Sequence, residues 1–340
     1  MKAAVVEAAG HLAIRDLPEP TPGDYDVLCE ILYGSVCSGT DRHIVAGTCP
    51  YSGPFPTILG HESIGRAVKC GPKVRYIEPG DLITRVGTPA VGDCSSTWGG
   101  FAEFGIAQDY RAARDDEVPA ARWAEGRRNQ VLPDGMDPAV ATLFITWRET
   151  LSYSNRIGFG EGRNILVVGS GGNGLAFVAH ATNANARQRV MIGSPRRKEI
   201  ALRAGVSHFI DYKSTTLAKE ISAVAPGGYD IVIDSLGRKG SGDFCVSMIT
   251  EHGVLGVYGL DDHAEYTVSP NKTETTFSIY GGHYDEPETH NQVLQLYQDG
   301  ELDPSIWLDP NAAFSLAELD RAIEAAESGT QVKPLVKIRG

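Results

Sequence analysis

The sequence predicts a two-domain α/β protein, in which a β-rich N-terminal domain is followed by a doubly wound parallel sheet. Three observations lead to this fold class. The 340 residues exceed one domain of average size. Residues 1–110 contain short apolar segments separated by Gly and Pro, which is typical of β-strands. From residue 137 onward, short apolar segments alternate with helical patterns, as βαβ units require.

The N-terminal part is expected to consist mainly of strands. The predicted strands are residues 2–8, 26–36, 62–71, 81–87 and 99–107. The segment 110–130 is charged and breaks this pattern, so we expect a long loop there with one helical turn.

The C-terminal part begins with a predicted helix at 138–158, where apolar residues recur at helical spacing. Strands are predicted at 164–169, 188–193, 208–212, 230–237 and 253–260, with helices at 196–205 and 214–225 and a final helix and strand at 316–329 and 331–340. Strands joined by helices in this way imply a parallel sheet.

Composition and charge exclude several functions. The net charge of −12 argues against a general nucleic-acid binder, because neutralising phosphates needs a basic surface. Glu7 interrupts the first apolar run, and no segment reaches the roughly 18 apolar residues of a membrane helix. From the charge and the short apolar segments we expect neither nucleic acid nor membrane as a partner. The six cysteines show no paired spacing, so we expect reduced thiols and a cytoplasmic location.

The most specific motif is a glycine-rich turn between a predicted strand and a predicted helix. It reads Gly169-Ser170-Gly171-Gly172-Asn173-Gly174. In this context the motif predicts dinucleotide binding, because the helix N-terminus offers free N–H groups to a pyrophosphate. The alternative is a glycine-rich turn that binds nothing.

The end of the next predicted strand bears on which nucleotide binds. NAD sites usually place Asp or Glu about 20 residues after the fingerprint, but here Gly193 is followed by Ser194, Arg196 and Arg197. Arginine binds phosphate through charge-assisted hydrogen bonds, so we expect NADP, with NAD as the alternative. Tyr212 is expected to flank the adenine or the phosphate. The alternative for both arginines is a solvated helix start.

The segment 35–47 holds Cys37, Thr40, Asp41 and His43 within seven residues, and alone it fits either a polar surface loop or an active-site wall. Further motifs follow it in a fixed order: Gly60-His61-Glu62, Gly80-Asp81, GGFAEF at 99–104, the fingerprint, and VKPLVKI at 332–338. With these motifs the chain resembles, over essentially its whole length, the medium-chain alcohol dehydrogenase/reductase superfamily. Within this superfamily, the sequence of the chain is most similar to the zinc-dependent sugar and polyol branch, which includes glucose and sorbitol dehydrogenases.

The resemblance implies a fold and domain boundaries. A GroES-like β-barrel catalytic domain is expected at 1–136, a Rossmann domain at 137–295, and a return to the catalytic domain at 296–340. Chemistry would then take place between the domains.

The resemblance also implies one catalytic zinc per chain, held by Cys37, His61 and Glu62. Three protein ligands leave a fourth position open for a substrate alcohol. Thr40 would accept the alcohol proton and His43 would pass it on. For Cys37, the alternative is a small buried thiol.

The sequence departs from the family pattern in three places. Ser38 stands where the family has its cysteine, and Cys37 lies one residue earlier. Ile145 occupies a position that often supplies a further ligand, and Glu149, one helical turn later, is the expected substitute; an ion pair with Arg148 or Arg156 is its alternative. The four-cysteine lobe is absent, so we expect no structural zinc.

The expected function is hydride transfer between NADP(H) and a secondary hydroxyl or ketone of a sugar, polyol or aminocyclitol, such as an aminoglycoside-pathway sugar. Acidic groups expected at the mouth of the site, Asp41, Glu62, Asp93 and Glu149, would suit an amino sugar. The alternatives are a metal-free quinone or enoyl reductase and a non-catalytic NADPH-binding sensor. A homodimer or homotetramer is expected.

Overall fold

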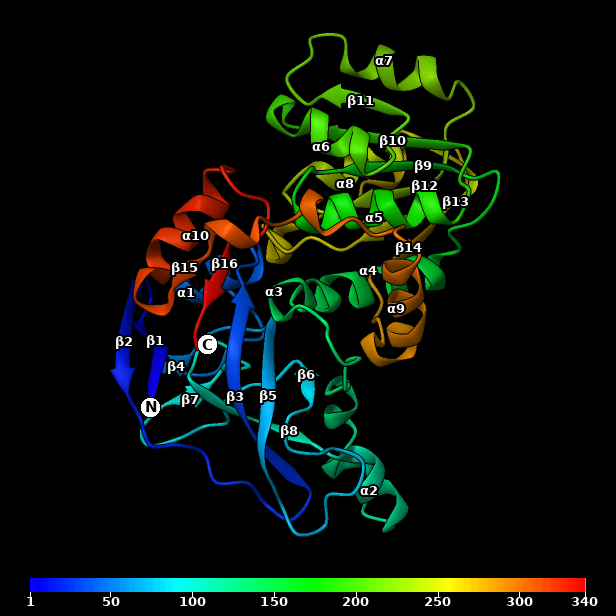
Figure 1. Ribbon diagram of the computed structural model, residues 1–340. Helices are drawn as coiled ribbons and strands as arrows, with labels where there is room; N and C mark the ends of the chain where they lie inside the picture. Colours follow the sequence, from blue (N-terminus) through cyan, green and yellow to red (C-terminus); the bar gives the residue numbers. More distant parts are fainter. Residues whose placement is uncertain (340) are drawn as a thin grey trace. The chain divides into compact units, whose positions relative to one another are not determined.

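The computed structural model describes residues 1–339 and divides the chain into two compact units (Figure 1). The first unit contains residues 1–145 and the segment from 307 onward, and the second contains Thr146–Ile306. The first is therefore built from two separated parts of the chain.

The first unit is mainly β-structure. One sheet has the order β2-β1-β4-β7, formed by His11–Asp16, Lys2–Ala8, Thr57–Ile58 and Ser95–Ser96. A second sheet has the order β15-β16-β3-β5-β6, formed by Phe314–Ser315, Leu335–Lys337, Asp26–Ser35, Ser63–Cys70 and Leu82–Thr84, and β8 (Phe104–Gln108) also pairs with β3. Buried aliphatic side chains of these strands form the core, as in the cluster of Val27, Ile31, Ile83 and Val86.

The C-terminal segment completes this second sheet. The helix α10 (Leu319–Glu327) buries Leu319, Ala322 and Ile323. β16 then pairs antiparallel with β3, and in Figure 1 the red β16 lies beside the blue β3. A strand from the end of the described chain thus lies beside one from its beginning.

The second unit is built around a parallel sheet of the order β11-β10-β9-β12-β13-β14. These strands are His208–Asp211, Gln188–Gly193, Asn164–Val168, Tyr229–Asp234, Ile249–Val257 and Ser278–Tyr280. All five pairings are parallel, and the order corresponds to the 3-2-1-4-5-6 arrangement of dinucleotide-binding folds. The predicted α/β fold class is therefore confirmed.

The remaining helices connect these strands or flank them. They are α1 (Thr40–Ala46), α2 (Tyr110–Asp115), α3 (Pro138–Ala141), α4 (Leu143–Ile157), α5 (Gly172–Asn183), α6 (Lys198–Arg203), α7 (Leu217–Val224), α8 (Ser241–Val246) and α9 (His290–Gln298). Within residues 1–339 none of the helices combines the length and the apolar character needed to cross a membrane.

Three parts of the chain differ from the sequence prediction. The predicted long loop at 110–130 contains α2 and two 3-10 helices, Ala120–Arg122 and Glu125–Arg128. The segment after Cys37, treated as a loop, forms the helix α1 from Thr40. The single helix predicted at 138–158 is divided into α3 and α4 at Thr142, although Thr142 itself keeps right-handed helical dihedral angles.

Candidate active site

Three strand ends meet in the first unit and bring distant residues together. β3 runs antiparallel to β5, with Gly34 opposite Ser63, so the end of β3 lies beside the start of β5. β16 pairs with the same end of β3, with Leu335 opposite Ser35. The residues just beyond these strand ends are therefore neighbours, whatever their separation in sequence.

Cys37, His61 and Glu62 converge at this point. One ligand atom from each, a thiol sulfur, an imidazole nitrogen and a carboxylate oxygen, lies within 4.8 Å of the other two. All three residues are buried, and they form the only such group of three or more found among residues 1–339. Sulfur, nitrogen and oxygen donors in this number are a set that fits a catalytic zinc.

Asp41 orients two of these residues, His61 and Cys37, through hydrogen bonds. Its Oδ1 accepts a hydrogen bond from His61 Nδ1 at 3.0 Å, and its Oδ2 accepts one from the backbone N–H of Cys37 at 2.9 Å. A carboxylate only accepts, so Nδ1 carries a hydrogen, and Nε2 is the nitrogen that can act as a ligand once it gives up any proton of its own. Nε2 is also the nitrogen that faces Glu62, 3.7 Å from its Oε1.

Glu62 is held as a carboxylate by two partners. Its Oε2 accepts a hydrogen bond from Ser35 Oγ at 2.6 Å, and its Oε1 forms an ion pair with Lys333 Nζ. The Glu62 and Lys333 side chains are 1% and 2% exposed. Burial would raise the pKa of Glu62, but Lys333 and then His61 outweigh it and hold the pKa at about 2.

The same charges act on the other two residues. Burial works against the Cys37 thiolate, but Lys333 and the hydrogen bond with His61 outweigh burial and lower the pKa of Cys37. For His61, burial disfavours the imidazolium, while Asp41 overcomes it and raises the pKa well above 6.5. The site therefore favours a thiolate and a carboxylate beside one another, which suits a divalent cation.

The shifted position of Cys37 is accommodated by a turn before α1. The backbone N–H of Asp41 donates to the carbonyl of Cys37 at 3.2 Å, so the chain between them closes one turn. This turn allows Cys37 to lie beside His61 despite the extra residue. Thr40 Oγ1 is 3.8 Å from the Cys37 sulfur. His43 is buried, and its Nδ1 lies 2.7 Å from Thr48 Oγ1.

Glu149 belongs to the other unit. Its carboxylate accepts hydrogen bonds from Tyr284 at 3.1 Å and from Tyr258 at 3.4 Å. The expected alternative partners are engaged elsewhere, because Arg148 forms an ion pair with Glu286 and Arg156 forms one with Glu288. Its role as a ligand stays a prediction.

The expectation that acidic groups line the mouth of the site is wrong for Asp41 and Glu62, which are buried, and Asp93 already has a partner. Asp41 is fully buried and bonds to His61 and Cys37. Glu62 is buried against Lys333, and Asp93 pairs with Arg15 at 2.8 Å. Each carboxylate is already compensated, so these groups provide no free charge for an amino sugar.

The fingerprint adopts the predicted conformation in the second unit. Gly169 follows β9 with φ = 111°, and α5 starts at Gly172. A Cβ atom on Gly174 would lie 2.2 Å from the carbonyl oxygen of Gly169, so only glycine fits there. A Cβ on Gly171 would meet nothing within 4 Å, so this glycine borders open space. The fingerprint therefore leaves its backbone accessible to a phosphate.

The residues expected near a 2′-phosphate follow β10 and β11. The backbone N–H of Tyr212 donates to the carbonyl of Gly193 at 3.1 Å, which joins the two strand ends. Arg196 is exposed, and partial burial lowers the pKa of the half-buried Arg197. Tyr212 is 52% exposed, and Lys213 Nζ lies 5.4 Å from the centre of its ring. Ser194 comes directly after the strand.

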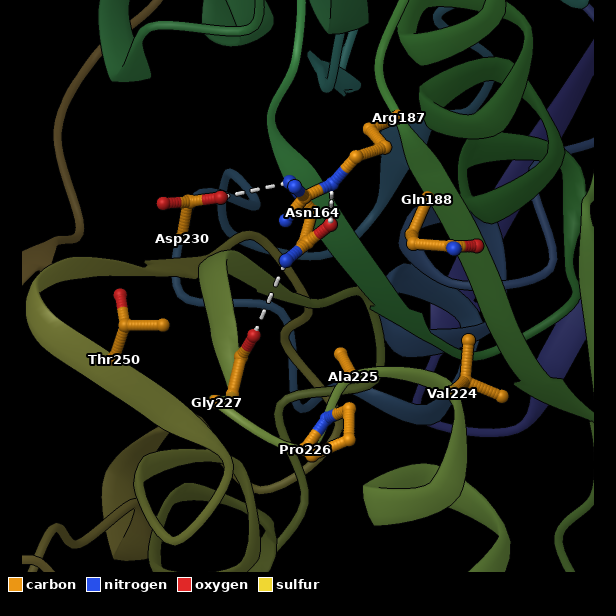
Figure 2. A pocket seen from close by; sticks show the side chains of 10 residues that line it. Asn164, Arg187, Gln188, Val224, Ala225, Pro226, Gly227, Asp230 and Thr250 are labelled. Carbon is orange, nitrogen blue, oxygen red and sulfur yellow. Dashed lines mark hydrogen bonds between the residues drawn. The ribbon is translucent and has the colours of Figure 1, made fainter.

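A cavity of about 550 Å³ lies elsewhere in the second unit, at the amino ends of the strands (Figure 2). Figure 2 shows Asn164 among its walls, with a hydrogen bond from its backbone N–H to Asp230 and one from Arg187 to its side chain. None of the predicted site residues lines this cavity. Dinucleotides bind at the carboxyl ends of such strands, so it is not the nucleotide site.

Sequence reasoning missed two functional residues of the site. Lys333 is 271 residues from Glu62. Its only signal in the sequence is that a lysine stands within the mostly apolar segment 332–338. For Asp41 the sequence predicts a place at the mouth of the site, whereas the structure buries it beside His61 and Cys37 as a positioning residue. Its position four residues after Cys37 signals a turn that would bury it.

Comparison with known proteins agrees with this geometry. Residues 23–121 match the family model of the alcohol dehydrogenase GroES-like domain, and residues 172–299 match that of the zinc-binding dehydrogenases. An L-threonine 3-dehydrogenase of Streptomyces avermitilis is 30% identical over 94% of this chain and 97% of its own. A sorbitol dehydrogenase of Halalkalibacterium halodurans is 24% identical over 99% of both chains.

Solved structures show the same fold. A zinc-binding dehydrogenase from Sinorhizobium meliloti bound to NADP superposes with a TM-score of 0.79 and 22% identity over 99% of both chains. Benzyl alcohol dehydrogenase from Acinetobacter calcoaceticus superposes with a TM-score of 0.83 and 17% identity, again over 99% of both.

Proposed function

The chain belongs to the zinc-dependent medium-chain alcohol dehydrogenase family, and on this premise we propose that it transfers hydride between NADP(H) and a secondary hydroxyl or ketone of a sugar, polyol or aminocyclitol. The observation that carries the proposal is the convergence of Cys37, His61 and Glu62. An enzyme of this family that uses zinc and NAD(P) needs such a donor set.

Cys37, His61 and Glu62 would hold the zinc. Asp41 fixes His61 so that Nε2 is available, and Lys333 keeps Glu62 ionised. A bound zinc would polarise the oxygen of an alcohol and lower its pKa. All three residues are buried, and electrostatic effects are stronger in a buried, low-dielectric site than in water.

Thr40 and His43 would move the alcohol proton. Thr40 begins α1 three residues after Cys37, and its hydroxyl lies near the thiol. His43 is one turn further along α1, with Thr48 on its Nδ1. A hydroxyl that both donates and accepts can hold the proton at Thr40 Oγ1, and an imidazole can pass it on.

The preference for NADP rests on the groups after β10 and β11. Ser194, Arg196, Arg197 and Tyr212 offer hydroxyls and guanidiniums, and no carboxylate lies between Gly193 and Glu199. Lys213 adds a further cation beside Tyr212. A 2′-phosphate would be attracted by these charges, whereas a 2′-hydroxyl would gain little.

Relatives with polyhydroxylated substrates support the proposed substrate class. Sorbitol dehydrogenase and the L-galactonate-5-dehydrogenase of Escherichia coli both act on polyols or their acids, as their names state. Oxidation of L-threonine is the second candidate, favoured by 30% identity to the Streptomyces avermitilis enzyme. All these substrates present a hydroxyl next to other polar groups.

One set of measurements tests the proposal. The purified protein, zinc-loaded, is assayed with NADP and NAD against sorbitol, galactonate, L-threonine and an aminocyclitol, while metal content is measured by mass spectrometry and assembly by light scattering. We expect about one zinc per chain, NADP-dependent oxidation of a polyol or aminocyclitol, and a dimer or tetramer. Turnover of L-threonine alone would favour the second candidate, and nucleotide binding without zinc or turnover would refute both.

A further inference from the structure

Ser170 fills the space that a side chain at position 193 would need. A Cβ atom on Gly193 would lie 2.4 Å from the Cβ of Ser170 and 2.5 Å from its Oγ. A ring carbon of Phe209 would be 3.3 Å away on another side. Carbon atoms that are not bonded do not approach to 2.4 Å, so Gly193 and Ser170 are sterically matched.

Ser170 is also fixed in this position. Its Oγ accepts a hydrogen bond from the backbone N–H of Ser194 at 3.0 Å. The strands beside it are held together as well, since the N–H of Gly169 donates to the carbonyl of Ile192 at 2.9 Å. The clash would therefore be with a Cβ attached to an ordered backbone, which a change of rotamer does not remove.

Position 193 is where an acidic residue would select NAD. It ends β10, the strand that follows the fingerprint helix, and lies opposite Asp211 of β11. In dinucleotide-binding folds an Asp or Glu at this place, about 20 residues after the fingerprint, accepts hydrogen bonds from the ribose 2′-hydroxyl. The same carboxylate repels a 2′-phosphate.

We propose that Ser170 is a specificity-determining residue, which excludes any side chain from position 193 and thereby keeps a carboxylate off the end of β10. This inference rests on the proposed preference for NADP. Ser170, the middle residue of the first Gly-x-Gly turn, then limits which residue can stand at position 193 at the end of β10. The residue at position 193 in turn determines which of the two nucleotides binds more tightly.

Four variants of the full chain test this: Gly193→Asp, Ser170→Gly with Gly193→Asp, Ser170→Ala with Gly193→Asp, and Ser170→Gly alone. NADH and NADPH affinities are measured by fluorescence titration, and folding by thermal melts. We expect no gain of NADH affinity in Gly193→Asp. Alanine keeps the Cβ of residue 170, so the variant with Ser170→Ala behaves in the same way.

Removal of that Cβ should change the result. In Ser170→Gly with Gly193→Asp we expect NADH affinity to rise by about tenfold or more over the unmutated chain, because a hydrogen bond to a charged group contributes on that scale, while NADPH affinity falls. An equal gain in Gly193→Asp alone, or no gain in the glycine double variant, would overturn the inference.

Two further outcomes are informative. If Gly193→Asp does not fold, the melting temperature of the smaller variant Gly193→Ala is compared with that of the double variant Gly193→Ala with Ser170→Gly. A higher melting temperature of the double variant supports the steric match between residues 170 and 193. An equal or lower melting temperature overturns it. Equal NADH and NADPH affinity in the unmutated chain would refute the proposed cofactor preference, whereas the comparison among variants would still decide whether Ser170 controls position 193.

Discussion

Replacing Lys333 by methionine should destabilise the first unit, and more so without zinc than with it. Lys333 and Glu62 are both almost fully buried. Methionine fills a similar volume but removes the cation that faces the Glu62 carboxylate, while Ser35 and His61 stay beside it. Breaking a buried ion pair from one side typically costs about 3–5 kcal/mol, because the remaining charge stays buried without compensation.

The pKa of Glu62 gives a similar magnitude. A fall from its ordinary value of 4.5 to about 2 corresponds to roughly 3 kcal/mol at about 1.4 kcal/mol per pH unit. The sign is that of a depressed carboxyl pKa: this stability is fully present above pH 4.5 and is lost as the pH falls toward 2. In a unit of this size 1 kcal/mol shifts Tm by about 2–4 °C, so a decrease of about 6–12 °C is expected.

The assay is thermal unfolding followed by circular dichroism, first after removal of metal with a chelator and then after zinc loading. Zinc would supply positive charge beside Glu62, so the decrease should be smaller in the loaded protein. Lys337→Met is the matched control, because Lys337 is an exposed lysine on β16. Equal Tm values for Lys333→Met and Lys337→Met in the metal-free state would refute the reasoning.

Four further outcomes are expected. Thr40→Val should lower turnover by about 10²- to 10⁴-fold with little change in Tm, since it removes only a proton-carrying hydroxyl; full activity would exclude the relay. Cys37→Ser should lower zinc content and activity together, because one of three proposed ligands is lost, and metal analysis showing full zinc would mean that Cys37 is a buried thiol. Replacing Arg196 and Arg197 by alanine should remove at least a tenfold preference for NADPH, as charge-assisted hydrogen bonds contribute about 1.5–3 kcal/mol each; nucleotide titration checks this, and an unchanged ratio contradicts it. Burial lowers the pKa of His180 from 6.5 to about 3, so the unfolded chain binds a proton at a higher pH than the folded chain does. The free energy of unfolding should therefore fall as the pH drops from 6.5 toward 3, by up to about 1.4 kcal/mol per pH unit. Urea unfolding should show a flatter pH dependence for His180→Gln, and identical curves would contradict the lowered pKa of His180.

The sequence predicted the parallel sheet well, because its strands are short, apolar and bounded by glycines or polar residues. It failed where elements are short or polar. β4, β7 and β14 have two or three residues, too few for a periodic pattern. The sequence predicts a loop at α1 because its first residues, Thr40 and Asp41, are polar, and only tertiary contacts show that Asp41 is buried.

The site could be predicted only in part for a related reason. His61 and Glu62 stand together in a recognisable triplet, so their role was visible in the sequence. The shifted Cys37 required knowledge of the turn that closes before α1. Lys333 required the pairing of β16 with β3, which no local pattern encodes. Residues that act through long-range packing are generally beyond local sequence reasoning.

The pairing of Glu62 with Lys333 also constrains when the site can mature during synthesis. The two residues are separated by 271 positions, and the whole of the second unit is translated between them. Until the ribosome has released the chain beyond β16, Glu62 lacks its cation and β3 lacks one of its neighbouring strands. The nascent first unit would therefore expose a carboxylate, a thiol and an imidazole to cellular metals for many seconds, at about 5–20 residues per second. The complete site, with Lys333 beside Glu62, would form only once the last strand has joined the sheet.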